Sequence, residues 1–166
     1  MKKKLPCVKS AGELGITKGQ RRNLAKLTAF VNTKVEPPKF DIKHYNSDSL
    51  SIATDEVSCG TTACFCGYGP LAGIAFERDS YGRADMWGGY ARKAFGAELW
   101  SCLYNLLFDA KHKNTKEAAV LRGAYFLMHG YPPCPVLNQY EYFRTWEVPT
   151  NFRPNWHSIR AVASAK

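Results

Sequence analysis

Residues 114–133 read NTKEAAVLRGAYFLMHGYPP, and this stretch carries the clearest structural signal in the chain. Asn114 can cap the start of a helix, with Glu117 three residues later at the capping-box position. Apolar side chains then recur at helical spacing, namely Ala118, Leu121, Ala124, Tyr125 and Met128. Gly130 and the two prolines beyond it are typical of a helix end. The stretch therefore predicts a helix over residues 115–129 with an apolar face, and a fold built on helix packing.

Further helices are predicted over residues 18–33, 62–76 and 97–109, and a short helix over residues 90–95. The first of these opens with a capping box of Thr17 and Gln20. Pro70 is expected to divide 62–76 into a short turn of helix up to Tyr68 and a second helix that starts at Pro70. A brief alternation of apolar and charged residues over 39–45 predicts one short strand or extended segment. Helices therefore dominate the expected fold.

These elements predict a mainly α, compact single-domain helical bundle with little or no sheet. A chain of 166 residues has the ordinary size of one domain. Residues 1–16 are predicted to be a flexible basic arm, and residues 17–166 a single globular helical domain. From Cys134 onward the chain is rich in Tyr, Phe and Trp and interrupted by proline, so this part is expected to wrap around the helical core.

The charge of the chain is strongly positive. It amounts to +9, from 23 lysines and arginines against 14 aspartates and glutamates. A field of this size attracts polyanions, so DNA or RNA, or an acidic host protein, is the expected partner. The chain has no run of eighteen apolar residues, and its basic start is followed by Lys9, Ser10 and Glu13. No membrane span and no export signal are therefore expected, and the expected location is cytoplasmic.

The basic residues suggest a binding surface. Lys18, Arg22 and Lys26 recur every four residues, opposite the apolar side of the first long helix. The whole candidate surface comprises Lys18, Arg21, Arg22, Lys26, Arg92, Lys93, Lys111, Lys113 and Lys116. Basic groups beside exposed aromatic rings suit phosphate contact and base stacking. Because no helix-turn-helix, RRM, KH or zinc-finger signature accompanies them, sequence-specific readout is not expected.

The six cysteines allow two chemical roles besides burial. Cys59, Cys64 and Cys66 could hold zinc with a fourth ligand, or Cys64 could act as a nucleophile. The residues that could complete such sites are His44, His112, His129, Cys102 and Cys134. Residues two apart on a helix point to different sides, which argues against joint ligation by Cys64 and Cys66. Small buried thiols are the favoured interpretation, so no metal and no cofactor are expected.

An acidic loop offers a further enzymatic alternative. Glu77, Asp79 and Asp85 could hold a hard cation for nuclease chemistry. They share their loop with Arg78 and Arg83, and no further acidic residue is spaced to join them. A solvated loop is therefore the favoured interpretation.

The cysteine segment also carries a family resemblance. Cys59-Gly60-Thr61-x-x-Cys64-x-x-Gly67 resembles a motif in small uncharacterised bacteriophage proteins. Looser matches are Phe95-Gly96, Leu106-Leu107-Phe108 and Asn114-Thr115-x-x-x-Ala119-x-x-Arg122. The resemblance covers Leu24 to Pro133, and it departs from the family at Gly69-Pro70, where Ala often follows the Gly-aromatic pair. It implies a phage accessory protein acting in a bacterial host cytoplasm, and it transfers no catalytic residue.

Three functions follow as hypotheses. The first is a non-enzymatic protein whose cationic surface binds nucleic acid or a nucleic-acid-bound complex, with affinity that falls steeply as salt rises. The second is an inhibitor that docks on an acidic surface of a host or anti-phage defence protein. The third is an enzyme that uses Cys64 or the acidic loop, and it ranks last because nothing in the sequence pairs a nucleophile with a base.

Overall fold

The computed structural model describes residues 7–40, 65–75, 86–98, 101–109, 112–113, 115–135 and 138–165. Its α-helices are α1 (Ala11–Leu14), α2 (Lys18–Lys34), α3 (Met86–Phe95), α4 (Cys102–Leu107), α5 (Lys116–His129), α6 (Gln139–Thr145) and α7 (Trp156–Ser164). Two short 3-10 helices, η1 (Pro37–Lys39) and η3 (Cys66–Tyr68), lie between α2 and α3. No strand occurs in the described ranges, and the predicted mainly α, compact fold is confirmed.

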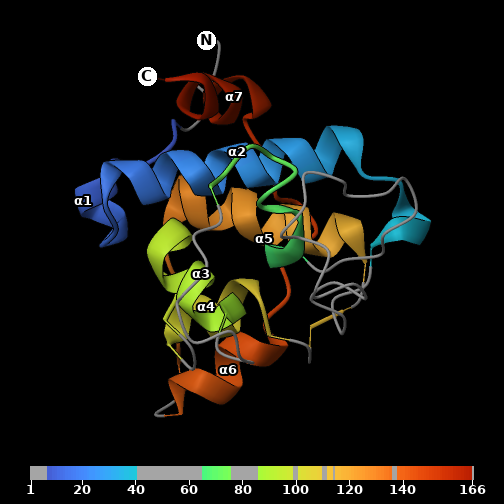
Figure 1. The fold of residues 1–166 in the computed structure, drawn as a ribbon. Coiled ribbons are helices and arrows are strands. Elements are labelled where there is room, and N and C mark those ends of the chain that lie inside the picture. Colours follow the sequence, from blue (N-terminus) through green and yellow to red (C-terminus); the bar gives the residue numbers. More distant parts are fainter. Residues whose placement is uncertain are drawn as a thin grey trace, which may run out of the picture.

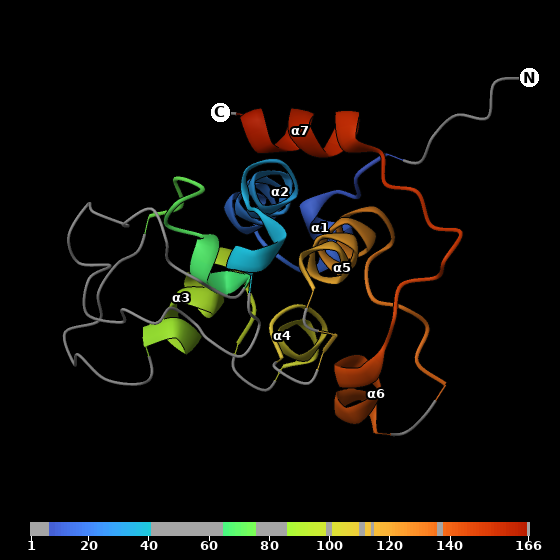
Figure 2. The same ribbon diagram turned by 90° about the vertical axis from the view of Figure 1, so that its right-hand side faces the viewer.

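The helices are stacked in layers (Figure 1). α2 and α5 lie side by side in the middle, and Figure 2 shows both of them end-on. α7 lies across α2 on one side, while α3, α4 and α6 lie on the other side of this pair. α2 packs against α3, α5 and α7, whereas α4 packs against α5 and α6. The helix pair α2 and α5 is thus the centre of the fold.

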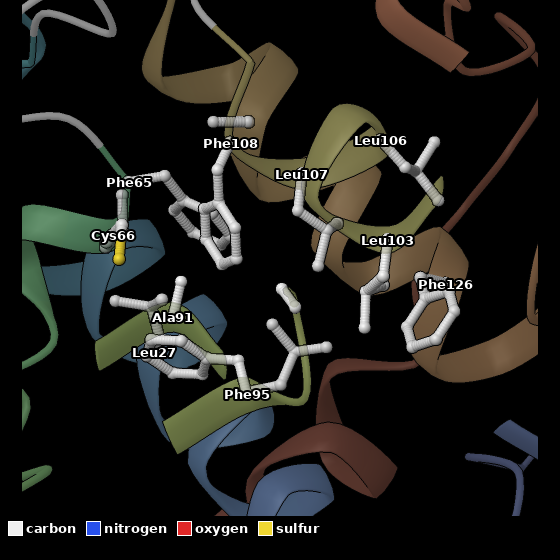
Figure 3. Packing of buried hydrophobic residues seen from close by; sticks show 14 of the residues in the cluster. Leu27, Phe65, Cys66, Ala91, Phe95, Leu103, Leu106, Leu107, Phe108 and Phe126 are labelled. Carbon is white, nitrogen blue, oxygen red and sulfur yellow. The ribbon is translucent and has the colours of Figure 1, made fainter. Parts of the chain in front are cut away.

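The core between these layers is rich in aromatic rings (Figure 3). The Phe108 ring lies 5.5 Å from the Phe95 ring and 5.9 Å from the Phe65 ring, measured between centroids. The largest side chains with no exposed surface are Phe65, Phe95, Phe126, Leu24, Leu27, Leu106, Leu107, Leu127 and Ile159. Because Phe65 belongs to this core, the irregular segment 65–75 is anchored against the helices that surround it.

A glycine of α5 lies in tight contact with α2. A Cβ atom at Gly123 of α5 would lie 2.7 Å from Oγ1 of Thr28 and 3.1 Å from Cζ of Phe65. Thr28 is fully buried, and its hydroxyl donates to the carbonyl of Leu24 at 2.7 Å. Only a residue without a side chain leaves room for this contact, so Gly123 fixes the spacing of the central pair.

The helix ends test the predicted capping signals. The capping box of α2 is confirmed, because Thr17 Oγ1 accepts from the N–H of Gln20 while Gln20 Oε1 accepts from the N–H of Thr17. The end of α5 is also confirmed, with Gly130 at a φ of 79° and its N–H donating to Phe126. The predicted cap of α5 is wrong by one residue. Thr115 is the N-cap, and its hydroxyl accepts from the N–H of Ala118.

Two predicted helices are shorter than expected. The short turn of helix predicted up to Tyr68 is present as η3, but the chain then turns at residues 69–73, so the helix predicted from Pro70 onward is wrong. The predicted helix 97–109 is reduced to α4, which begins after Ser101 caps it by accepting from the N–H of Tyr104. Burial was predicted correctly for α4 and for residues 65–69, but Leu71 is exposed. Burial of an apolar residue does not require a helix.

Other differences concern the two ends of the described chain. Residues 11–14 were expected to lack regular structure, yet they form α1 with a capping box of Ser10 and Glu13. The aromatic tail contains two helices, α6 and α7, that no pattern predicted.

The possible strand over 39–45 lies outside the described residues except for its first two positions. None of the described helices combines the length and the apolar character that crossing a bilayer requires.

Candidate functional site

The basic residues of α2 face three different neighbours. Lys18 is exposed, while Arg21, Arg22 and Lys26 are half-buried. Nη1 of Arg21 donates to the carbonyl of Lys9 at 2.9 Å, which directs Arg21 toward the segment before α1. Nη1 of Arg22 donates at 3.3 Å to the carbonyl that follows α7. The basic side chains that were expected to form one surface on α2 therefore lie near three different helices, α1, α7 and α3.

One hollow gathers basic residues from two helices. It has a volume of about 380 Å³ and lies between α2, α3 and the end of the segment 65–75. Its lining residues are Arg22, Asn23, Lys26, Gly73, Ile74, Ala75, Tyr90, Lys93 and Ala94. Three of these described residues are cationic and none of them is acidic. We call this hollow the α2–α3 pocket.

The position of α3 against α2 is fixed by side chains of α2 that hold the last turn of α3. Nδ2 of Asn23 donates to the carbonyl of Ala94 at 3.0 Å. Nε2 of Gln20, the same residue that closes the capping box, donates to the carbonyl of Arg92 at 3.1 Å. These carbonyls are in the last turn of α3, where the Arg92 carbonyl also accepts from the N–H of Gly96 at 3.0 Å. The bonds bring Lys93 to the side of α2 that carries Lys26.

The floor of the α2–α3 pocket contains a buried tyrosine. The Tyr90 hydroxyl donates to the carbonyl of Ile74 at 3.2 Å, and burial raises the pKa of this phenol well above its usual range. A Cβ atom at Gly69 would overlap the Tyr90 ring, at 2.1 Å from its oxygen. Because Gly69 has no side chain, the Tyr90 ring can pack against it and form the floor of the pocket. The tyrosine is only 4 % exposed, so its ring face is not free to stack on a base.

The remaining basic candidates do not converge on this pocket. Lys18 and Arg21 line a second hollow of about 450 Å³ between α1, α2 and α7, which Arg22 also touches. Arg92 and Lys113 are exposed at other positions. Nζ of Lys116 donates to the carbonyl of Val35 at 2.7 Å, which ties the start of α5 to the end of α2. Lys111 lies outside the described residues.

Most of the cysteine motif lies outside the part of the chain that the structure describes. Cys59, Gly60, Thr61 and Cys64 lie outside the described residues, as does His44. Gly67 is buried in η3, next to the buried Cys66. Cys102 and Cys134 are partly buried, and burial together with the neighbouring Cys134 raises the pKa of Cys102. A raised pKa disfavours the reactive thiolate. Among the described residues, no group of three or more His, Cys, Asp and Glu side chains could hold a metal ion.

The described candidate residues of the enzymatic alternatives do not form a catalytic arrangement. The His129 ring lies 4.8 Å from the Tyr125 ring and 5.6 Å from the Phe152 ring, so it is part of an aromatic cluster. The acidic loop with Glu77, Asp79 and Asp85 lies outside the described residues.

One buried residue was missed by the sequence reasoning. Arg122 lies on α5 and is only 3 % exposed, although arginine is mostly a surface residue. It sits within a 14-residue helix that has eight buried positions, including Ala119, Ala124 and Phe126. An arginine inside such an apolar stretch is itself the signal that could have marked it, since arginine is almost never fully buried unless it is paired.

The chain matches no protein-family model, no curated protein and no solved structure in the comparisons made.

Proposed function

We propose that this chain is a non-enzymatic nucleic-acid-binding protein whose α2–α3 pocket holds the phosphate backbone. The observation that carries the proposal is the meeting of Arg22, Lys26 and Lys93 around one hollow whose described lining has no acidic residue. Cations from two helices in one concave site concentrate positive potential there. The net charge of +9 adds long-range attraction for a polyanion.

The lining of the pocket also favours a particular mode of binding. Phosphate contacts from lysine and arginine carry no sequence information, whereas base readout needs side chains that reach base edges or stack on them. Tyr90, the aromatic residue of the pocket, is buried with its hydroxyl engaged. Binding should therefore be independent of sequence and dominated by phosphate contacts. The resemblance to bacteriophage proteins supplies the proposed setting, a phage accessory protein in a bacterial host.

The salt dependence follows from the number of cations. Three phosphate contacts correspond to a slope of about −2.7 in a plot of log affinity against log salt on duplex DNA. Affinity should then fall about forty-fold between 50 and 200 mM salt. Additional contacts from other basic residues would make the slope steeper.

The test is fluorescence anisotropy with labelled duplex DNA, single-stranded DNA and RNA of mixed sequence, across a salt series. The double variant Lys26→Gln/Lys93→Gln should flatten the slope by about two and weaken binding at least tenfold. The matched control is Lys34→Gln/Arg160→Gln, which removes two exposed positive charges away from the pocket. The control should weaken binding by less than about threefold.

Two outcomes would overturn the proposal. One is the absence of binding to any of the three nucleic acids at low salt, and the other is an equal effect of the pocket pair and the control pair. Capture of one bacterial protein from nuclease-treated lysate, together with the first outcome, would favour the inhibitor hypothesis instead.

A further inference from the structure

A second pocket lies on a different part of the molecule, between α5, α6 and the irregular segment that joins α6 to α7. Its volume is about 530 Å³, within the range of small-molecule sites. Figure 2 shows the joining segment alongside α5. The segment is anchored there by ring contacts, because the Tyr125 ring of α5 lies 4.7 Å from the Trp146 ring and 5.3 Å from the Phe152 ring. We call this space the Arg122 pocket.

The Arg122 guanidinium is buried in the wall of this pocket without a hydrogen-bond partner for part of its donors. Nε and Nη2 of Arg122 have no partner among the residues that the structure describes. Leaving a charged donor unpaired in the interior is costly, and removing its partner typically destabilises a protein strongly. Nε–H and one N–H of Nη2 point in parallel from the same edge of the guanidinium. That edge is the fork that receives the two oxygens of a carboxylate.

The charges around the pocket favour a ligand with a single negative charge. Four cationic side chains line it, from Lys113, Arg122, Arg144 and Arg153, together with the carboxylates of Glu117 and Glu147. Arg144 is already paired, with Asp109 Oδ2 at 2.8 Å and with Glu141 at 3.5 Å. The three other cations face two carboxylates, which leaves one positive charge in excess. A polyanion such as a nucleic-acid strand would be repelled by Glu117 and Glu147.

The Arg122 side chain keeps its charge at neutral pH despite its burial. Burial lowers the pKa of Arg122 to about 10, and the nearby Glu147 acts in the opposite direction. His112, which also lines the pocket, stays neutral because burial and then the charge of Arg122 lower its pKa to about 4. Its Nε2–H donates to the backbone carbonyl of Asn105. Arg122 is therefore the buried cation of the pocket.

The rest of the lining is mostly apolar. Trp146 and Phe152 contribute rings, and Leu121, Val148, Pro149 and Pro154 contribute aliphatic surface. Aromatic and proline walls with few polar groups suit a flat apolar body, while the polar groups fix its orientation. A suitable ligand thus combines an aromatic body with one carboxylate.

We propose that the Arg122 pocket binds a small aromatic monocarboxylate, with the carboxylate on the Nε and Nη2 edge of Arg122 and the ring against Trp146 and Phe152. Both nitrogens are shielded from solvent, so the side chains that cover them have to shift before a carboxylate can reach them. This site is separate from the α2–α3 pocket, with which it shares no lining residue.

The test uses 2-naphthoate as the probe, with binding to the full chain measured by titration calorimetry and ligand-observed NMR. The neutral isostere 2-naphthamide should bind at least about tenfold more weakly than 2-naphthoate, because it cannot form the charge-assisted fork. The dianion 2-naphthyl phosphate should also bind more weakly, since it faces the two carboxylates. Arg122→Met should lose the preference for the carboxylate over the amide.

A second variant keeps the test decisive if Arg122→Met does not fold. Glu147→Gln removes an exposed carboxylate next to Arg122 and should tighten 2-naphthoate binding about two- to fivefold. Lys26→Gln, in the other pocket, is the control and should leave binding unchanged. The proposal is overturned if 2-naphthoate does not bind, if the amide or the phosphate binds equally well, or if Glu147→Gln weakens binding.

Discussion

The substitution Gly123→Ala tests the central contact of the fold, because the new methyl group would meet Thr28 Oγ1 at 2.7 Å. Ordinary contact begins at 3.4 Å, so the hydroxyl would have to retreat by about 0.7 Å. Thr28 is fully buried and β-branched, and rotating it away would break its bond to the Leu24 carbonyl. The Phe65 ring, at 3.1 Å from the new atom, limits movement on the other side.

The expected magnitude combines a cost and a gain. Overpacking a core costs about 1 to 3 kcal/mol, and a lost buried hydrogen bond about 1 kcal/mol more. Replacing glycine by alanine inside a helix returns about 1 kcal/mol. Gly123→Ala should therefore lower the free energy of unfolding by about 2 kcal/mol, which corresponds to a fall in Tm of about 4 to 8 °C.

Urea unfolding followed by circular dichroism measures this change, with Gly89→Ala as the matched control. Gly89 lies inside α3, and a Cβ atom there would meet nothing within 4 Å. The control should raise the free energy of unfolding by about 0.5 to 1 kcal/mol. In a Thr28→Ala background, Gly123→Ala should cost at least about 1 kcal/mol less than alone. A stabilising Gly123→Ala, or effects at the two positions that simply add, would refute the reasoning.

Two further predictions concern buried ionisable groups. Because the pKa of His112 is lowered to about 4 in the folded protein, its unfolded state binds a proton first. The free energy of unfolding should thus fall by up to about 3 kcal/mol as pH decreases from 6.5 to 4. Over the same pH range, the urea midpoint of His112→Gln should fall less steeply than that of the unsubstituted protein. Parallel pH profiles of the two proteins would contradict this. Asp109→Asn breaks the partly buried pair with Arg144, at 2.8 Å, and should cost about 1 to 3 kcal/mol in urea unfolding. Glu36→Gln, in an exposed pair, should cost less than about 0.5 kcal/mol, and equal costs would show that burial of the first pair has no consequence.

The parts of the fold that the sequence predicted are those with local signals. The capping box at Thr17 and the glycine at 130 mark helix ends through bonds between residues close in the chain. The segment 65–75 has no such signal. Its small residues fit several backbone shapes, and its turn is held by distant contacts such as the packing of Tyr90 over Gly69.

The sequence predicted which basic residues belong to the candidate site, but not how they meet in space. Arg22 and Lys26 were placed on one side of α2 by their spacing. Their meeting with Lys93 depends on where α3 docks, and that depends on the bond from Asn23 to the carbonyl of Ala94, 71 residues away. The Arg122 pocket was missed for a similar reason, since its outer wall comes from the segment between α6 and α7.

The position of α7 across α2 has a consequence for how the chain is made. α2 belongs to the first part of the described chain and α7 to its last part, and the bond from Arg22 to Ala165 joins residues 143 positions apart. A ribosome releases α2 long before α7 exists. The side of α2 that α7 covers therefore stays open to water, and to other nascent chains or chaperones, until the chain has been synthesised past Ser164.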